Sequence, residues 1–392
     1  MCAWLPTERS RRYSVSPRAD ERPAVLRGTA EGAPIVRLAS LAAALSLSLA
    51  HGAAQAPVPT ARHTTEFRGL TMGGTFSVKV VTTQEELEST GFGDVDRALR
   101  ARLDRLNRLM STWDPDSELS RFNRSTSLEP FAVSPETFEV FTWSIDVGAL
   151  TGGALDVTIG PLVDAWGFGP GGPRNARPTN EEIARLREAM GPGRIELNPT
   201  ALTVRKTRPE VRCDLSSVVP GYAADRLWTE LSDRGFRDFL VDVGGEVRTR
   251  GRNENGVPWR VAIERPESQG DAIQRLVTIS DLAITTAGDY RKYRDVDGQR
   301  VTHILDPRTG RPLTHRLASV TVIDALAVRA DAFDTALMVL GTDEGMALAT
   351  KLNLAALFIE RTVEGFSERA TPRFEEITST RARRPVAGRE AL

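Results

Sequence analysis

Histidine and cysteine are scarce in this chain, whose 392 residues include 4 histidines and 2 cysteines. Cys2 and Cys213 are too few for a disulfide framework or a zinc centre, and we expect Cys213 to be a small buried apolar residue. The chain also lacks an excess of either charge, since 51 Lys and Arg residues balance 52 Asp and Glu residues. Without a net field or a basic patch, we expect no binding to nucleic acid.

Nucleotide-binding fingerprints are missing as well. No G-x-G-x-x-G opens a helix directly after a strand, no G-x-x-x-x-G-K phosphate loop is present, and there is no strong internal repeat. Strand patterns such as 239–243 and 259–263 pair locally through Gly and Asn turns, and 92–110 carries a helical stripe of apolar residues. We therefore predict an α+β fold of mixed, mainly antiparallel sheets with flanking helices, not a Rossmann fold.

The first 56 residues differ from the rest of the chain. Residues 1–34 are polar and rich in Arg and Pro, and a short apolar region at about 38–50 follows Arg37 and leads into small residues up to Ala56. This order is typical of a secretory signal peptide and predicts an exported protein, periplasmic or at the periplasmic face of the inner membrane. An uncleaved anchor or a buried helix is the alternative. Residues 376–392 form a polar tail, so the folded domain is expected to span 57–375.

Two acids and a hydroxyl occur at helical spacing within the stretch 330–341. Asp331, Asp334 and Thr335 stand at i, i+3 and i+4, so one turn of helix would present them to the same small volume. Such hard oxygen ligands suit Mg²⁺ or Ca²⁺, and Mg²⁺ is usually held by one or two carboxylates together with substrate phosphates. The alternative is an exposed helix start, where acids favour the positive end of the helix dipole.

His303 lies three residues before Asp306, which begins a proline turn. Histidine titrates near neutrality and is the commonest proton-transfer residue, so His303 is a candidate base. Bracing of the turn is the alternative role.

Eight blocks of the chain together resemble the FAD:protein FMN transferases, the ApbE family. In chain order they are Met72-Gly73-Gly74-Thr75, Ser117 to Asn123, Ala154-Leu155-Asp156 through Trp166-Gly167-Phe168-Gly169, Asp214 to Asp225, Val243-Gly244-Gly245, Thr286 to Tyr290, His303 to Gly310, and Asp331 to Thr335. The resemblance covers roughly 66–360 and implies an α+β enzyme with the flavin in a cleft between two subdomains.

The same resemblance implies a set of ligand-binding positions. Around FAD it places Met72, Trp113, Ala154, Leu155, Asp156, Asp214, Pro220 and Leu305, and around Mg²⁺ it places Ser217, Asp331, Asp334 and Thr335. Three positions depart from the family pattern. Trp113 replaces a common Tyr and keeps an aromatic face, Pro220 replaces the usual Lys or Glu, and Ser217 replaces Thr, Gly or Ala.

The activity implied by the resemblance is Mg²⁺-dependent transfer of the FMN moiety of FAD to a Thr or Ser hydroxyl of an acceptor flavoprotein, with release of AMP. We expect His303 to be the base and Asp306 its orienting partner. The family's acceptors are subunits of membrane redox complexes that face outside the cytoplasm. Two alternatives stay open at this point: a Mg²⁺-dependent FAD pyrophosphatase that gives FMN and AMP, and a non-enzymatic flavin-binding protein, which would not need the cluster at 331–335.

Overall fold

The computed structural model describes residues 61–174, 176–267, 272–296 and 298–380, which belong to one compact unit. The expected leader at 1–56, with its apolar region at 38–50, lies outside these residues, as does the tail from 381 onward. No helix within the described ranges has the length and apolar character needed to cross a membrane.

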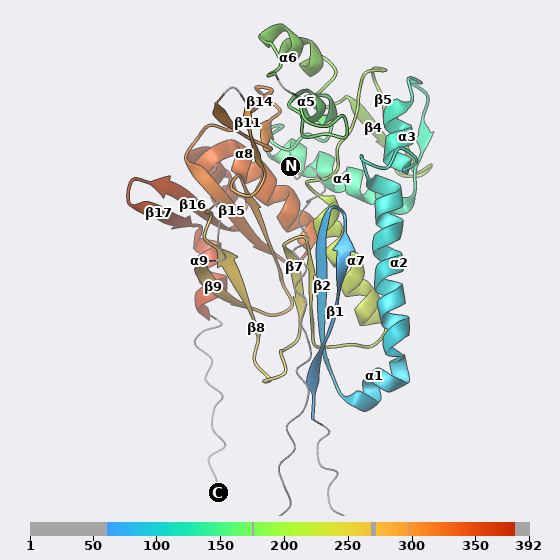
Figure 1. The fold of residues 1–392 in the computed structure, drawn as a ribbon, viewed down its shortest axis with the longest axis vertical. Helices are drawn as coiled ribbons and strands as arrows, with labels where there is room; N and C mark the ends of the chain where they lie inside the picture. Colours follow the sequence, from blue (N-terminus) through green and yellow to red (C-terminus); the bar gives the residue numbers. More distant parts are fainter. Residues whose placement is uncertain (1–60, 175, 268–271, 297, 381–392) are drawn as a thin grey trace, which may run out of the picture. The chain divides into compact units, whose positions relative to one another are not determined.

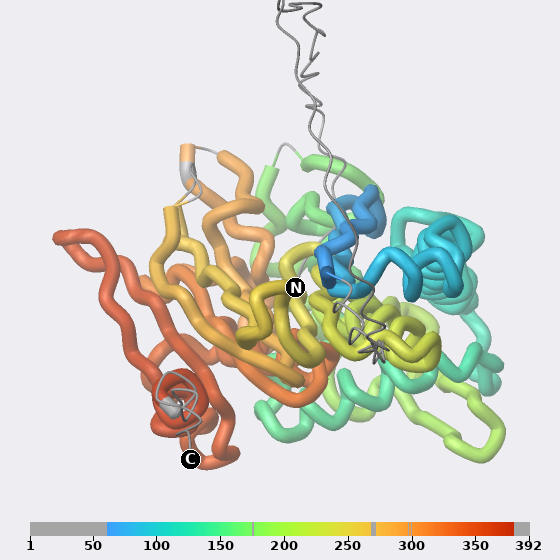
Figure 2. The backbone as a smooth tube through the Cα atoms, turned by 90° about the horizontal axis from the view of Figure 1, so that it is seen from below, coloured from blue at the N-terminus to red at the C-terminus, as the bar shows by residue number. Residues whose placement is uncertain are grey.

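An eight-stranded sheet organises the fold, in the order β1-β2-β6-β7-β10-β15-β16-β17. Its strands are β1 (His63–Thr71), β2 (Gly74–Thr82), β6 (Phe239–Val243), β7 (Glu246–Arg250), β10 (Ala283–Gly288), β15 (Leu317–Asp324), β16 (Ala355–Thr362) and β17 (Gly365–Ala370). Every neighbouring pair in this sheet is antiparallel. The β1–β2 and β16–β17 hairpins lie at opposite edges, blue and red in Figure 2. The predicted α+β class is therefore confirmed, without a Rossmann arrangement.

Helices cover the sheet unequally (Figure 1). The described helices are α1 (Gln84–Thr90), α2 (Phe92–Met110), α3 (Glu118–Arg124), α4 (Pro135–Leu150), α5 (Gly160–Ala165), α6 (Asn180–Arg187), α7 (Val219–Asp233), α8 (Ala327–Lys351) and α9 (Pro372–Thr380). Helices α7 and α8 pack together against the central strands, with α2 against α7 and α4 against α8. The opposite face is covered by α9 and by the separate hairpin of β8 (Trp259–Glu264) and β9 (Ile273–Ile279).

Alternation along β7 and β10 decides which side chains face α7 and α8. Val247 pairs with Ile284, and both belong to the apolar cluster on the α9 side. Because neighbouring side chains of a strand point to opposite faces, Glu246, Arg248 and Thr285 lie on the face that α7 and α8 cover. Polar groups on the sheet thus lie under the two helices.

A smaller apolar cluster forms a second subdomain. It joins α5 and α6 to the hairpin of β11 (Tyr293–Val296) and β12 (Gln299–Thr302) and to β13 (Leu305–Asp306), which pairs with β14 (Arg311–Pro312). The Trp166 indole donates a hydrogen bond of 2.9 Å to the carbonyl of Gly310. A further three-stranded sheet combines β3 (Phe131–Ala132), β5 (Thr203–Lys206) and β4 (Ile195–Asn198).

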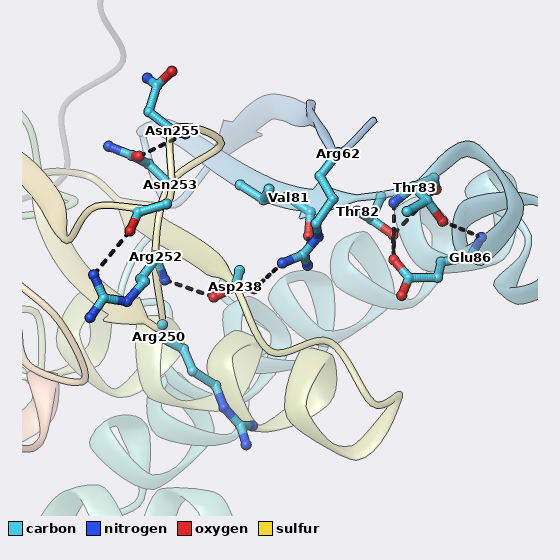
Figure 3. A network of polar contacts seen from close by, with 12 residues as sticks. Arg62, Val81, Thr82, Thr83, Glu86, Asp238, Arg250, Arg252, Asn253 and Asn255 are labelled. Atoms are coloured by element: carbon cyan, nitrogen blue, oxygen red, sulfur yellow. Dashed lines mark hydrogen bonds and ion pairs between the residues drawn. The ribbon is translucent and has the colours of Figure 1, made fainter. Parts of the chain in front are cut away.

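The start of the described chain is fixed by a polar network (Figure 3). The Arg62 guanidinium contacts Asp238 at 2.5 Å and donates to the Val81 carbonyl at 2.7 Å, and the Arg252 amide donates to Asp238 at 2.7 Å. At the start of α1, Thr83 and Glu86 form a capping box. This network ties β1 and β2 to the loops beside β6 and β7.

Several predicted elements are confirmed to the residue, and others differ. The helix 92–110 and the strand 239–243 are α2 and β6. The strand predicted at 259–263 is β8, which pairs with β9, the next strand along the chain, in a separate two-stranded sheet. The domain end expected at 375 falls inside α9, whose Phe374 is buried, because this helix packs against β16.

Candidate functional site

The candidate site is centred on the first turns of α8. Asp331 and Asp334 are 4% and 1% exposed, and Thr335 is also buried, so they are not the acids of an exposed helix start. Helix α8 is interrupted at Gly341, whose backbone has φ of 77° and ψ of 178°. The predicted helix is therefore continuous over residues 330–340 and is interrupted at Gly341, after which a second helical segment follows.

Three buried carboxyl groups, those of Asp331, Asp334 and Glu246, repel one another electrostatically in this region. Burial raises the pKa of Asp331, Asp334 and Glu246 well above the usual range, because it disfavours the charged form. Repulsion adds to the effect: Asp334 raises the pKa of Asp331, Glu246 raises that of Asp334, and Asp331 raises that of Glu246. Within the described residues, none of the three forms a salt bridge.

The acids have few hydrogen-bond donors. The Gly221 amide donates to Asp331 Oδ2 at 2.8 Å, and the Thr335 hydroxyl donates weakly to Asp334 Oδ1 at 3.4 Å. Glu246 Oε2 and the Ser217 hydroxyl are buried and have no hydrogen-bond partner among the described residues. Buried polar atoms left in this way are costly unless a ligand satisfies them.

These features fit a divalent cation. A cation bound by Asp331 and Asp334 would relieve the repulsion, and the oxygens of Asp331, Asp334, Thr335 and Ser217 are the hard ligands that Mg²⁺ prefers. Within the described part of the chain, no group of three or more His, Cys, Asp or Glu side chains meets the geometry of a metal centre. A Mg²⁺ site completed by substrate phosphates does not need such a group, since one or two carboxylates suffice.

A pocket of about 310 Å³ contains two of the predicted flavin-binding residues, Trp113 and Asp214. Trp113 follows Ser111, whose hydroxyl accepts hydrogen bonds from the Trp113 and Asp114 amides at 3.1 Å each and so fixes the turn after α2. Burial raises the pKa of Asp214, so this carboxyl keeps its proton to higher pH than usual. The guanidinium groups of Arg124 and Arg212 also line the pocket.

The other predicted flavin contacts lie in different places. Met72 lines a narrow cavity of about 10 Å³ with Ser216 and Val219, and Thr112 lines both this cavity and the larger pocket. Leu155 and Asp156 line a separate cavity of about 90 Å³. The structure thus brings Met72, Trp113 and Asp214 around one region.

Asp156 has a local bonding role. It accepts hydrogen bonds from the Thr158 amide at 2.9 Å and the Thr158 hydroxyl at 2.6 Å, and burial raises its pKa. Ala154, Pro220 and Leu305 are buried, and Pro220 occupies the first turn of α7. Cys213 is buried, as expected, and burial raises the pKa of its thiol, which leaves it unreactive.

His303 is 3% exposed and its ring is held by a backbone group. Its Nδ1 lies 2.8 Å from the Lys292 carbonyl. Since a carbonyl can only accept, Nδ1 carries the proton and Nε2 keeps a lone pair. Burial lowers the pKa of His303 to about 3, so the ring is neutral at physiological pH.

The orienting role expected for Asp306 is taken by the Lys292 carbonyl. Asp306 instead accepts from the Arg308 amide at 2.8 Å and pairs with the Arg308 guanidinium at 3.0 Å, which closes the turn after His303. The physical reason is that the His303 ring is already bonded to the Lys292 carbonyl, while the Arg308 guanidinium two residues after Asp306 reaches its carboxylate directly.

Four residues with a part in this region were not singled out from the sequence: Glu246, Thr285, Asp225 and Arg248. The order of strands in the sheet brings Glu246 and Thr285 under α8, and no local pattern reveals that order. One signal was available for Glu246, because it directly follows Gly244-Gly245, one of the eight blocks.

Comparison with known proteins agrees with this geometry. The model of the ApbE family matches residues 72–358. The FAD:protein FMN transferase of Vibrio cholerae is 42% identical over 315 residues, which are 79% of this chain and 92% of that protein. The FAD:protein FMN transferase of Escherichia coli is 38% identical over 344 residues, 86% of this chain and 96% of that protein. The structure of the flavin transferase ApbE from Vibrio cholerae superimposes with a TM-score of 0.73 at 40% identity, covering 80% of this chain and 99% of that one.

Proposed function

The chain belongs to the ApbE family of FAD:protein FMN transferases, and from that premise we propose that it is a Mg²⁺-dependent enzyme that attaches FMN to a Thr or Ser hydroxyl of an acceptor flavoprotein and releases AMP. The observations that support the metal dependence are the buried, mutually repelling carboxyl groups of Asp331, Asp334 and Glu246 and the buried Ser217 hydroxyl, which has no hydrogen-bond partner among the described residues. A flavin-binding protein without catalytic activity would have no use for such a costly arrangement.

Asp331, Asp334, Thr335 and Ser217 would hold the cation. Asp331 uses Oδ2 for the Gly221 amide, which leaves Oδ1 for a metal. A bound Mg²⁺ would neutralise negative charge on the pyrophosphate oxygens of FAD, and this would lower the barrier to attack at phosphorus.

The flavin substrate would lie along the residues that the family resemblance places around it. Trp113 offers an aromatic face at the pocket of about 310 Å³, and the buried Asp214 carboxyl at the same pocket is available for a hydrogen bond with the substrate. Arg124 and Arg212 supply positive charge at the same wall. Met72, Ala154, Leu155, Asp156, Pro220 and Leu305 complete the proposed contacts with FAD.

The reaction exchanges one phosphorus–oxygen bond for another. The acceptor hydroxyl oxygen bonds to the phosphorus of the FMN half, the bond to the bridging oxygen breaks, and AMP leaves with that oxygen. The hydroxyl proton goes to His303 Nε2, whose lone pair is available because the Lys292 carbonyl fixes the proton on Nδ1. The negative phosphates of FAD would stabilise the imidazolium that forms, which offsets the low pKa of the buried ring.

We further propose that the protein is exported and acts on flavoprotein subunits of membrane redox complexes. The support is the signal-like order of residues 1–56. An uncleaved leader would instead keep the protein attached to the membrane.

The test uses the purified full-length chain, FAD, Mg²⁺ and a candidate acceptor flavoprotein. We expect a fluorescent acceptor band on a denaturing gel, its loss with EDTA, and its loss when the acceptor hydroxyl is removed. Release of FMN and AMP at the same rate with and without acceptor would instead establish an FAD pyrophosphatase.

A further inference from the structure

The helix that carries Asp331 and Asp334 depends at its start on a carboxylate from another helix. The N-cap residue of α8, Leu326, has no side chain that can cap. Asp225 of α7 accepts from the Ala327 amide at 2.9 Å and from the Val328 amide at 3.0 Å. The first amides of an α-helix have no partner within the helix, and a carboxylate there also complements the helix dipole. Asp225 therefore fixes the start of α8 to α7.

Asp225 is itself held from the sheet. The Arg248 guanidinium donates to Asp225 Oδ1 at 2.7 Å, and the two side chains are 13% and 4% exposed. Arg248 also lies over the Trp228 ring, with Cζ 4.2 Å from the ring centroid. One buried carboxylate thus joins α7, α8 and β7.

The two helices also approach closely one turn away from this contact. A Cβ atom on Gly221 would lie 2.5 Å from the Ala327 carbonyl oxygen and 2.7 Å from Asp331 Cβ, so only glycine allows this approach. The Gly221 amide donates to Asp331 there. Gly221 and Asp225 are four residues apart and so share one face of α7. That face contacts the start of α8 and the candidate metal ligand together.

We infer that Asp225, held by Arg248, is a positioning residue of the cation site: it fixes the start of α8 against α7 and thereby the positions of Asp331 and Asp334. The inference rests on the proposed function, because it requires that these residues bind a divalent cation. Asp225 contacts neither the cation nor the substrate in this account. It acts through the placement of the ligands.

The expected loss of metal affinity can be taken from the behaviour of other metal sites. Loss of a group that orients a ligand typically weakens metal affinity about 10- to 100-fold. Asp225→Asn keeps the shape and one acceptor oxygen, but the new amide group cannot accept from Val328 and has no charge for Arg248. We expect this variant to bind Mn²⁺ about 10- to 100-fold more weakly than the unchanged chain.

Asp324→Asn is the matched control. Asp324 bonds the start of the same helix, accepting from the Ala325 amide at 2.8 Å and the Leu326 amide at 3.3 Å, and it pairs with Arg329. It belongs to the segment that enters α8, so it adds a carboxylate at the same helix end without joining α8 to α7. Both variants should lower the melting temperature, but Asp324→Asn should change Mn²⁺ affinity less than twofold.

The experiment measures free Mn²⁺ by electron paramagnetic resonance during titration of full-length protein with saturating FAD, corrected by a titration of FAD alone, at a temperature where each variant is folded. A melting temperature lowered by Asp225→Asn with unchanged Mn²⁺ affinity would overturn the inference and make Asp225 a purely structural residue. If the unchanged chain itself bound no Mn²⁺, the proposed metal dependence would fail instead. If Asp225→Asn does not fold, Arg248→Lys provides the same test, because lysine keeps the charge but lacks the several N–H donors of the guanidinium. We expect this variant to bind Mn²⁺ about tenfold more weakly.

Discussion

Acidification should unfold this protein partly through His303. In the folded chain, burial lowers the pKa of His303 from 6.5 to about 3. The unfolded chain therefore binds a proton at this residue between these pH values while the folded chain does not, and the free energy of unfolding must fall as the pH drops through that window. This contribution is fully present above pH 6.5 and is lost progressively towards pH 3.

The magnitude follows from the same difference in pKa. At about 1.4 kcal/mol per pH unit, the full window corresponds to about 5 kcal/mol, and the part between pH 7 and pH 4 to about 3 kcal/mol. Water entering the pocket on protonation reduces this value, so we expect about 2–3 kcal/mol between pH 7 and pH 4.

The comparison needs a variant that keeps the local hydrogen bond without a titrating ring. In His303→Asn the amide group can still donate to the Lys292 carbonyl. Urea unfolding of both proteins at several pH values, in the absence of metal, gives the free energies of unfolding. The other acids titrate in both proteins and cancel in the difference. Equal pH dependence of the two proteins would refute the buried, neutral state of His303.

The remaining predictions concern activity, metal and location. Asp331→Asn should slow FMN transfer by at least about 10²-fold and remove the rise in melting temperature that Mg²⁺ gives; full activity in the presence of EDTA would exclude the metal assignment. His303→Ala should bind FAD with near-normal affinity yet transfer FMN about 10²- to 10⁴-fold more slowly, whereas an unchanged rate would show that the proton goes elsewhere. Glu246→Gln should raise the melting temperature of the metal-free protein by about 2–4 °C, since one of three repelling carboxylates is removed; a lower melting temperature would contradict the repulsion. Residues 1–60 fused to a reporter that is active only outside the cytoplasm should give signal in a Gram-negative host, and a silent fusion retained in the cytosol would overturn the proposed export.

Local patterns predicted the elements that local physics decides. The spacing of apolar residues in 92–110 fits a helix. The residues that this periodicity places on the apolar face are the ones buried in α2: Val95, Leu99, Leu103, Leu106 and Met110. The spacing of Asp331, Asp334 and Thr335 likewise predicted their common location, because i, i+3 and i+4 positions meet on any helix.

Contacts between distant segments could not be predicted in this way. Glu246 approaches Asp331 only because β7 lies beside β10 under α8, and strand order is a property of the whole fold. Asp225 and Arg248 are 23 residues apart in the chain, and neither lies in a pattern that indicates a buried ion pair. The tautomer of His303 depends on the Lys292 carbonyl, 11 residues earlier in the chain, so the sequence suggested Asp306, the nearest acid, instead.

The pH dependence of activity illustrates the same limit. From the sequence, a histidine base would give a rate that rises with pH around the ordinary value of 6.5. Burial of His303 lowers its pKa to about 3, so the pH range in which the rate rises moves down towards pH 3 in the free enzyme. The profile of kcat/KM, which reports groups of the free enzyme, should therefore be flat in the region of pH 6.5.

The most direct test of the central claim is the ratio of two products in one reaction. Full-length protein, FAD, Mg²⁺ and an acceptor flavoprotein are incubated, AMP is quantified by chromatography, and covalently bound FMN is quantified from the intact mass of the acceptor. A flavinyltransferase gives one AMP for each FMN attached, and replacing the acceptor hydroxyl stops both. AMP formed without any mass gain on the acceptor would contradict the proposed transfer.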